Sequence, residues 1–538
     1  MMKKGGHRLR KILTMGMAAI FLLAVMLSGC SSKADQGDQT LNLNITGEPT
    51  SLDPAQAFDE DSLDITHNLF VGLMRLDENH QPQPAIAEKV ETSEDGRVYT
   101  FTLRQTKWSD GSPLTAHDFE FAWKRVLNPE TASKAAFLLY FIKGAEAYNQ
   151  GKAGVEGVGV QALDDDTLRV ELEKPTPSFL ELTAYPVYAP VSRQAYEKNP
   201  DMFENTQNYV SNGAYRLAEW KHNNYVKITK NENFYKANEV KLDGIHFSVI
   251  TDNQTVYQMF QTKKLHVASK SSIPGEMLTR LIGEEKVKTM EGSGLSFFRF
   301  NVKEKPFTNK KIRQAFALAV DRKLITEQIV GSGEEPAYAY VAPSVPDNFR
   351  KEGGNLISDG QYEKARQLLA EGMKEEGWDR LPTVTLMYSN ATDKNKKVVE
   401  AVQEMYRKHL GVEIQLQAKE KKVYYADQEN TRFVMSTSSF LADYNDAYNY
   451  LESFQTGHPM NRTNWSNEKY DALLKQASET ADPESRKKLL HEAEAILFEE
   501  MPVFPLYYYN TAYMEQPGVK GIIRHPVGPK DYTHAEVN

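Results

Sequence analysis

The stretch Ser438-Ser439-Phe440-Leu441-Ala442-Asp443-Tyr444-Asn445 begins as an apolar, strand-like run and ends in an acid followed by turn-forming residues. An extended segment of this kind can pair its backbone with another extended chain. The carboxylate of Asp443 would then hold a cation at one end of the added chain, and the α-ammonium of a peptide is such a cation. From the residues alone, a simpler interpretation is that Asp443 caps a helix over 447–454.

Residues 1–29 have the pattern of a secretory signal peptide. Five basic residues lie within the first eleven positions, and an apolar run of sixteen residues follows over 12–27. That run is shorter than the roughly 20 residues that a membrane-spanning helix needs. It ends in Leu27-Ser28-Gly29-Cys30, which is similar to the lipobox of bacterial lipoproteins. We therefore expect cleavage before Cys30 and acylation of its sulfur; the alternative is an ordinary secretory peptide with an incidental cysteine.

Cys30 is the only cysteine in the 538 residues, so the exported chain would have no disulfide and would depend on core packing. Acyl chains on Cys30 would hold the protein on a membrane surface, with residues 30–39 as a tether. Loss of residues 1–29 removes five basic residues and no acids, which changes the formal net charge from −9 to −14. A negative charge of this size argues against nucleic acid as a partner.

Strand and helix patterns alternate along the remaining chain, which favours mixed α/β domains. Five hundred residues exceed one hydrophobic core, so two or three domains are expected. Residues 40–46, 99–103 and 168–172 alternate as strands, and Asn212-Gly213 has the composition of a hairpin turn. Thr115 with Asp118, and Asp482 with the following proline, are typical of helix starts.

Signatures of catalysis are missing from the sequence. It has no His-Glu-x-x-His pattern, no Gly-x-Ser-x-Gly elbow and no phosphate-binding loop in the required strand–loop–Lys order. The twelve histidines are scattered. We therefore expect no enzyme activity, no cofactor and no metal site, although a surface hydrolase stays open because paired carboxylates are recognised only from geometry.

Several segments share their order and spacing with one family. They are Ser51-Leu52-Asp53-Pro54, Lys107-Trp108-Ser109-Asp110-Gly111, Val210-Ser211-Asn212-Gly213-Ala214-Tyr215, Ala319-Val320-Asp321-Arg322 and Ala442-Asp443-Tyr444-Asn445. Each alone is weak, but together they span nearly the whole mature chain. With them the chain resembles the oligopeptide-binding proteins of ABC importers, within family 5 of the extracytoplasmic solute-binding proteins.

The resemblance implies an α/β fold of the type II periplasmic-binding-protein class, with two lobes that close like a clam and an additional third domain. Lobe I would take residues 40–70, 206–293 and 509–538, and domain II would take 71–205. Lobe III would take 294–508. The chain would cross between the lobes near 293 and 508, which would form the hinge.

The resemblance also implies ligand contacts. An aspartate matching Asp443 pairs with the α-ammonium of the peptide in this family. The strand Ser439-Phe440-Leu441 and, from the opposite lobe, Phe58-Asp59-Glu60 would bond to the peptide backbone. The tyrosine run at 507–509 would lie near the hinge and the pocket. Alternate strand residues share a face, so Tyr507 and Tyr509 are candidates for the cleft, although the parity stays open.

Two positions depart from the pattern of the enterobacterial members of this family. Thr437 stands where those proteins have an arginine that holds a tripeptide carboxylate, and Lys421 replaces an aromatic pocket residue. We therefore expect Lys421 or Arg462 to supply the countercharge. Phe297 is a further candidate contact, although a strand aromatic is more often part of the core.

The expected protein is a monomeric, lipid-anchored receptor on the extracytoplasmic face of a Gram-positive cell membrane. It would bind short peptides and deliver them to the permease subunits of an ABC importer. A murein tripeptide receptor or a signalling-peptide receptor of the same fold stays open, and so does a metal or metallophore binder.

Overall fold

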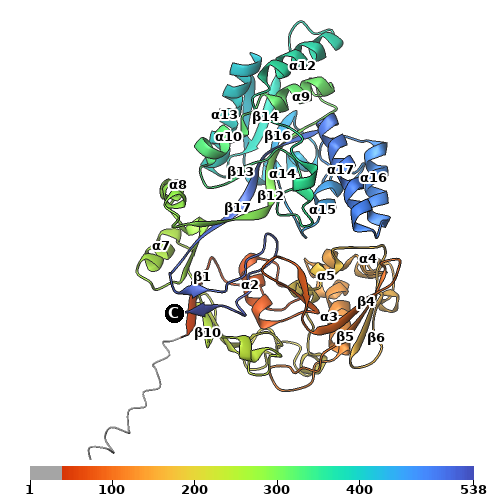
Figure 1. Ribbon diagram of the computed structural model, residues 1–538, viewed down its shortest axis with the longest axis vertical. Coiled ribbons are helices and arrows are strands. Elements are labelled where there is room, and N and C mark those ends of the chain that lie inside the picture. The colour runs from red at the N-terminus through yellow and green to blue at the C-terminus, as the bar shows by residue number, and fades with distance from the viewer. Residues whose placement is uncertain (1–38) are drawn as a thin grey trace, which may run out of the picture.

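The computed structural model describes residues 39–538, so the predicted signal peptide, Cys30 and nearly all of the tether lie outside the described residues. Two long antiparallel strands, β12 (Lys288–Phe300) and β17 (Val503–Glu515), connect the two ends of the molecule (Figure 1). No helix within the described range is both long and apolar enough to cross a membrane.

The pairing between β12 and β17 is interrupted in the middle. Lys288 to Glu291 lie opposite Tyr513 to Asn510, and Leu295 to Arg299 lie opposite Tyr508 to Val503, with a register shift between the two stretches. The shift falls at 292–294, where the chain passes from one lobe to the other. An irregular ladder at this place suits a hinge, because it concentrates bending in a few residues.

Lobe I is built around the four-stranded sheet β1-β10-β9-β8, in which β1 and β10 are parallel and the other pairs antiparallel. Helices α7 and α8 pack on the lobe I end of the hinge strands through a small core that includes Phe260, Leu281 and Met514. The elements are β1 (Thr40–Ile45), α2 (Glu60–Leu69), β8 (Tyr215–Lys221), β9 (Tyr225–Lys230), β10 (Gly244–Val249), α7 (Asn253–Gln261), β11 (Val267–Ser269), α8 (Gly275–Gly283), β18 (Val519–Lys520) and β19 (Glu536–Val537).

Domain II is built around the antiparallel sheet β4-β5-β7-β6. Helix α3 begins with the predicted capping box, since the backbone N–H of Thr115 donates to the Asp118 carboxylate at 2.9 Å. The elements are β2 (Met74–Leu76), β3 (Pro82–Pro84), β4 (Ala87–Thr92), β5 (Val98–Leu103), α3 (Ala116–Leu127), α4 (Ala145–Asn149), β6 (Val160–Ala162), β7 (Thr167–Glu171), α5 (Phe179–Leu182) and α6 (Arg193–Lys198).

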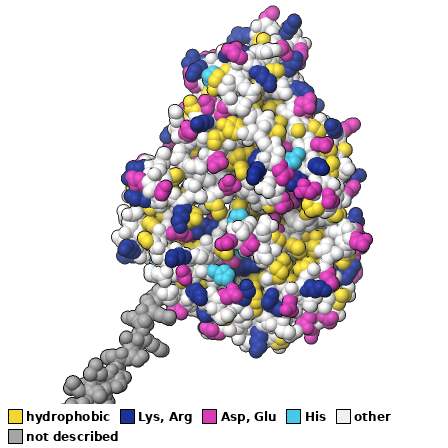
Figure 2. Space-filling model, viewed as in Figure 1, with side chains coloured by type: hydrophobic (Ala, Val, Ile, Leu, Met, Phe, Trp, Pro, Cys, Tyr) yellow, Lys and Arg dark blue, Asp and Glu magenta, His cyan; other side chains and the backbone are white. Residues whose placement is uncertain are grey.

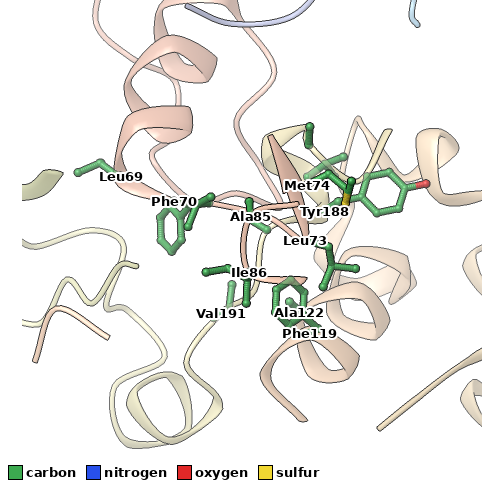
Figure 3. Close-up of a cluster of buried hydrophobic side chains, with 14 of the residues drawn as sticks. Leu69, Phe70, Leu73, Met74, Ala85, Ile86, Phe119, Ala122, Tyr188 and Val191 are labelled. Atoms are coloured by element: carbon green, nitrogen blue, oxygen red, sulfur yellow. The ribbon is translucent and has the colours of Figure 1, made fainter. Parts of the chain in front are cut away.

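Lobe I and domain II share one hydrophobic core. Leu69 and Phe70, at the end of α2, lie in the same buried cluster as Ile86, Phe119 and other domain II side chains (Figure 3). A shared core predicts that the two parts move together as one body. The predicted limits of 40–70, 71–205, 206–293, 294–508 and 509–538 stay predictions, because this core continues through the limit at residue 70.

Lobe III is built on the larger sheet, ordered β11-β17-β12-β16-β14-β15, with β13 also paired to β17. Its own core includes Phe297, Phe316 and Tyr406. The elements are α9 (Lys310–Leu318), α10 (Arg322–Leu324), β13 (Glu335–Pro336), α11 (Phe349–Gly353), α12 (Tyr362–Glu375), β14 (Val384–Ser389), α13 (Asp393–Leu410), β15 (Ile414–Lys419), α14 (Lys421–Glu429), β16 (Met435–Leu441), α15 (Ala447–Glu452), α16 (Glu468–Glu479) and α17 (Pro483–Glu500).

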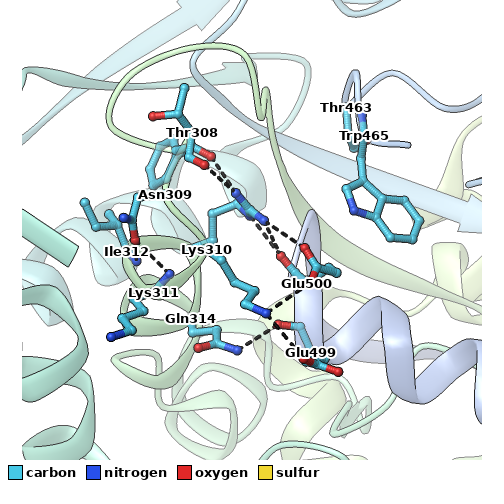
Figure 4. A network of polar contacts seen from close by, with 12 residues as sticks. Thr308, Asn309, Lys310, Lys311, Ile312, Gln314, Thr463, Trp465, Glu499 and Glu500 are labelled. Atoms are coloured by element: carbon cyan, nitrogen blue, oxygen red, sulfur yellow. Dashed lines mark hydrogen bonds and ion pairs between the residues drawn. The ribbon is translucent and has the colours of Figure 1, made fainter. Parts of the chain in front are cut away.

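Helix α17 is fixed at both ends by polar contacts. Asp482 caps its start, as predicted, and accepts from the backbone N–H of Ser485 at 2.8 Å. At its other end Lys310 of α9 reaches Glu499 and Glu500, with Nζ 3.3 and 3.1 Å from their carboxylate oxygens (Figure 4). The two Lys310 contacts join α9 to the end of α17.

Asn212-Gly213 is not a hairpin turn, so this expectation was wrong. The Asn212 amide bonds to both backbone groups of Val71, and a Cβ on Gly213 would lie 2.5 Å from the carbonyl carbon of Leu69. Glycine is therefore required by the close approach of two chain segments, and the Asn-Gly pair joins α2 to the segment before β8. The predicted fold class is confirmed: two mixed α/β lobes joined by crossing strands, with an additional domain.

Candidate ligand-binding site

Strand β16 presents an open edge near the hinge. It pairs with β12 along its whole length, from Met435 opposite Phe300 to Leu441 opposite Gly294. On its other side β14 pairs only with Met435 and Ser436. Within residues 39–538, the stretch 437–441 therefore has no strand on that side, and the side chain of Leu441 is 70% exposed. An unpaired edge of this kind is a template for an extended chain.

The hinge holds this edge in place. A Cβ on Gly294 would lie 2.5 Å from the Phe440 carbonyl oxygen, so only glycine lets β12 approach β16 this closely. The next contact joins the Ala442 N–H to the carbonyl of Ser293 at 2.9 Å. Residues 439–442, and with them Asp443, are thus attached to the segment in which the hinge register changes.

Asp443 lies at the end of this edge and does not cap a helix. The N-cap of α15 is Asp446, which accepts from the backbone N–H of Tyr448 at 2.7 Å, so the simpler sequence interpretation of Asp443 was wrong. The Asp443 backbone N–H donates to the Asn449 side chain at 2.9 Å. Its side chain reaches solvent, yet the surrounding protein desolvates the carboxylate and raises its pKa, which a contact with Asn449 partly opposes.

A pocket of about 230 Å³ opens beside β16, at the place where β14 and β16 diverge. Tyr507 and Tyr509 both line it, with their ring centroids 5.8 Å apart. Tyr508 points to the other face of the sheet, where its hydroxyl donates to the Ala339 carbonyl at 2.7 Å. Tyr507 and Tyr509 are therefore the two tyrosines of this run that face the pocket, because alternate residues of a strand share a face.

The charged lining of this pocket is entirely basic. Arg299, Lys421 and Arg462 line it, and no acidic side chain does so. Ser439 also lines it, so the structure brings together five of the predicted contacts: Ser439, Lys421, Arg462, Tyr507 and Tyr509. Arg462 lies 3.6 Å from a Glu429 oxygen at the pocket rim.

Arg299 was missed by sequence reasoning. It is only 3% exposed, and its Nη2 donates to the Ser438 hydroxyl at 2.6 Å. Burial lowers the pKa of this guanidinium to about 10, and the nearby Arg462 acts in the same direction. The sequence offered one signal for it: a single cation within the aromatic run Phe297-Phe298-Arg299-Phe300, which indicates a buried charge that needs a partner.

Phe297 does not line the pocket, which corrects its expected role. It is buried in the core of lobe III and packs edge-on against Tyr340, with ring centroids 5.3 Å apart. Its neighbours Ser296 and Phe298 line the pocket instead. Phe440 also turns toward Tyr340 and Tyr450, so the contribution of Phe440 to the open edge comes from its backbone.

The segment Phe58-Asp59-Glu60 lies on lobe I and does not line the β16 pocket. Asp59 caps α2 by accepting from the Ser62 N–H at 2.9 Å, and Glu60 pairs with Lys530 at 2.9 Å. Both carboxylates have partners within lobe I, and the predicted backbone contact of this segment with a peptide stays a prediction. Phe58 is half exposed, so its side chain stays accessible to a ligand together with the backbone of the segment.

Lobe III touches domain II beside Asp443. The ring of Tyr444 meets that of Phe141 edge-on at 5.6 Å, and Lys174 lies 5.1 Å from the ring centre of Tyr448. The Asn445 N–H donates to Glu181 at 3.2 Å. Burial raises the pKa of Glu181 to about 7, and nearby Asp446 adds to the effect.

Charges of both signs are mixed over the visible surface (Figure 2), in keeping with a mildly acidic chain of net charge −9. Among the described residues, no cluster of His, Cys, Asp or Glu has the arrangement of a metal site. The β16 edge, Asp443 and the basic pocket are thus the features that can recognise a solute, and the alternative of a metal or metallophore binder gains no site within residues 39–538.

Two lobes joined by crossing strands, with an open strand edge and a pocket beside the crossing, define a solute-binding protein. The chain belongs to family 5 of the bacterial extracellular solute-binding proteins, whose middle-region model matches residues 81–462. It is 42% identical to the dipeptide-binding protein DppE of Bacillus subtilis, over 99% of this chain and 100% of the relative. The resemblance drawn from the sequence is confirmed.

Two solved relatives match the structure to different degrees. The unliganded open form of the murein tripeptide-binding protein MppA has a TM-score of 0.83 at 30% identity, covering 93% of this chain and 97% of that one. Listeria monocytogenes OppA bound to peptide has a TM-score of 0.71 at 29% identity, covering 94% and 100%. The structure is therefore more similar to the open form of MppA than to the peptide-bound form of Listeria monocytogenes OppA.

Proposed function

We propose that this protein is an extracytoplasmic receptor that binds short peptides between its lobes and delivers them to an ABC importer. The observation that carries the proposal is the unpaired edge 437–441, which ends at the carboxylate of Asp443. A peptide placed along this edge receives backbone hydrogen bonds, and its α-ammonium lies at the acid. Membership of a family of binding proteins agrees with a receptor that leaves the ligand intact.

Backbone pairing supplies affinity without selecting a particular side chain. The side chains of the peptide would enter the pocket beside Tyr507 and Tyr509, where polar groups and water accept varied shapes. Closure of lobe I with domain II toward lobe III would bring the backbone of Phe58-Asp59-Glu60 onto the opposite edge of the peptide. The irregular register of the hinge strands at 292–294 suits this motion.

We infer from the sequence that the receptor is a monomer anchored through acylated Cys30, on the outer face of a Gram-positive membrane. The only cysteine of the sequence stands in a lipobox pattern, which supports the anchor, and the similarity to the Bacillus subtilis relative supports this origin. The permease subunits of the importer would receive the ligand from the closed form.

A murein tripeptide is the second candidate ligand. It carries more than one carboxylate, and the pocket is lined by three cations and no acid. The MppA structure named above is that of a murein tripeptide-binding protein. A signalling peptide is a third ligand of the same class, and it would use the same edge and the same acid.

Calorimetry tests the proposal directly. Purified protein is titrated with Ala-Ala-Ala and with N-acetyl-Ala-Ala-Ala, and native mass spectrometry identifies ligands that remain bound after purification. We expect the free peptide to bind at least tenfold tighter than the acetylated one, because acetylation removes the cation. Equal affinity for the two peptides would contradict the proposed role of Asp443, and recovery of cleaved peptide would indicate a hydrolase.

A further inference from the structure

Arg299 differs from the other buried arginines of the structure. Arg313, Arg322, Arg350 and Arg524 are each buried, and each forms an ion pair, with Glu500, Asp359, Glu494 and Glu515 respectively. Arg299 is equally buried but forms no ion pair within residues 39–538, and two of its nitrogens, Nε and Nη1, have no hydrogen-bond partner there. A buried guanidinium without a countercharge is costly, so a partner from outside the chain is the simplest explanation.

The surroundings of Arg299 favour an anion as that partner. Its guanidinium lines the pocket beside β16 together with Arg462, whose Nε also lacks a partner among the described residues. Lys421 adds a third cation at the rim, while the acids of this acidic chain are absent from the lining. The one polar contact of Arg299 is the neutral hydroxyl of Ser438, which leaves its charge uncompensated.

We propose that Arg299, assisted by Arg462, binds a carboxylate of the peptide ligand. This inference rests on the proposed function, and it names a chemical class: peptides with a carboxylate at a defined distance from the α-ammonium. Two planar guanidiniums provide several N–H donors that match the geometry of a carboxylate. Exclusion of water around Arg299 strengthens the pairing relative to one on the surface. The Arg299 guanidinium also lies over the aromatic ring of Phe297, with Cζ 5.2 Å from the ring centroid, and this cation–π contact helps to keep the side chain in place.

The spacing along β16 limits where this carboxylate can lie. Ser438, the partner of Arg299, precedes Asp443 by five residues, which is at most about 17 Å of extended chain. A bound peptide rises by about 3.3 Å per residue, so the carboxylate belongs to one of roughly the first five residues. It is either the C-terminal carboxylate of a peptide of three to about five residues, or an acidic side chain in the same part of a longer peptide.

Two matched peptide pairs distinguish these sources by calorimetry. Ala-Ala-Ala against its C-terminal amide tests the terminal carboxylate, and Ala-Glu-Ala-amide against Ala-Gln-Ala-amide tests the side chain. We expect the wild type to prefer the acid at least tenfold in one pair. Arg299→Gln should abolish this preference and leave the affinity for the two neutral peptides within about threefold of wild type. Lys422→Gln is the matched control, an exposed cation on α14 that does not line the pocket, and it should keep the full preference.

Each outcome has a distinct meaning. Binding of all four peptides to the wild type without an acid preference overturns the inference, and so does a preference that survives in Arg299→Gln. Failure of all four to bind contradicts the proposed function instead. Thermal unfolding shows whether Arg299→Gln is folded; if it is not, Arg462→Gln replaces it and should reduce the wild-type preference at least threefold. A full preference in that variant also overturns the inference.

Discussion

The backbone N–H of Asn445 in lobe III donates to the carboxylate of Glu181 in domain II, with N and Oε1 3.2 Å apart. This contact lies two residues from Asp443, the proposed ammonium site. A second buried acid, Glu452, lies in the same contact region and bonds to Asn449 at 3.2 Å. Burial raises the pKa of both Glu181 and Glu452 to about 7. The junction of the lobes therefore titrates near neutral pH.

The raised pKa values predict how stability depends on pH. Between pH 4.5 and 7 the folded protein keeps protons on Glu181 and Glu452 that the unfolded chain has lost. Folding stability from these groups is therefore fully present below pH 4.5 and decreases as the pH rises to 7. Each group accounts for at most about 3 kcal/mol. The free energy of unfolding is measured in urea from pH 5 to 8. Its decrease with pH should be about half as large in Glu181→Gln as in the wild type, and likewise in Glu452→Gln. A decrease as large as in the wild type would contradict the assignment.

Asp443→Asn should weaken binding of Ala-Ala-Ala by about 100-fold, because the variant keeps the shape of the side chain but loses the charge that faces the ammonium. Calorimetry measures the change. The N-acetylated peptide is the internal control, since it lacks the cation and should bind the variant and the wild type alike. A loss of the same size for both peptides would indicate damage to the cleft instead of loss of an ion pair.

Gly213→Ala should lower the free energy of unfolding by about 1–3 kcal/mol, the usual cost of overpacking. The added methyl group would lie 2.6 Å from the Asn68 carbonyl oxygen. Gly47→Ala is the matched control, because nothing lies within 4 Å of its Cβ, and it should be neutral. Urea unfolding followed by circular dichroism compares the two variants, and equal stabilities would contradict the close approach seen here.

Glu494→Ala should cost about 3–5 kcal/mol, since it leaves Arg350 buried without its countercharge. The same carboxylate accepts hydrogen bonds from the backbone N–H groups of Tyr340 and Val341, both at 2.9 Å. Glu484→Ala on the same helix removes a surface pair with Lys487 and should change stability by no more than about 1 kcal/mol. Chemical denaturation of both variants gives the comparison.

The residues that carry local signals were interpreted correctly from sequence. Thr115 with Asp118, and Asp482, mark helix starts because a cap bonds to an N–H only two or three residues away. The alternation at 99–103 marks β5 for a similar reason, since the side-chain period belongs to the strand itself. Asn212-Gly213 was wrongly interpreted as a hairpin turn. The same dipeptide suits a tight turn and a close contact between chain segments, and the partner here is Val71, which lies 141 residues away in the sequence.

The sequence by itself determined the mixed α/β class, the family and the strand that ends at Asp443, since these depend on order and spacing along the chain. Only the tertiary structure decided that Asp446 and not Asp443 caps α15, that Phe297 is core, and that Tyr507 and Tyr509 share the pocket. Arg299 shows the reason most clearly. Its burial and its contact with Ser438, 139 residues further along, arise from the register of β12 on β16, and no neighbouring residue encodes that register.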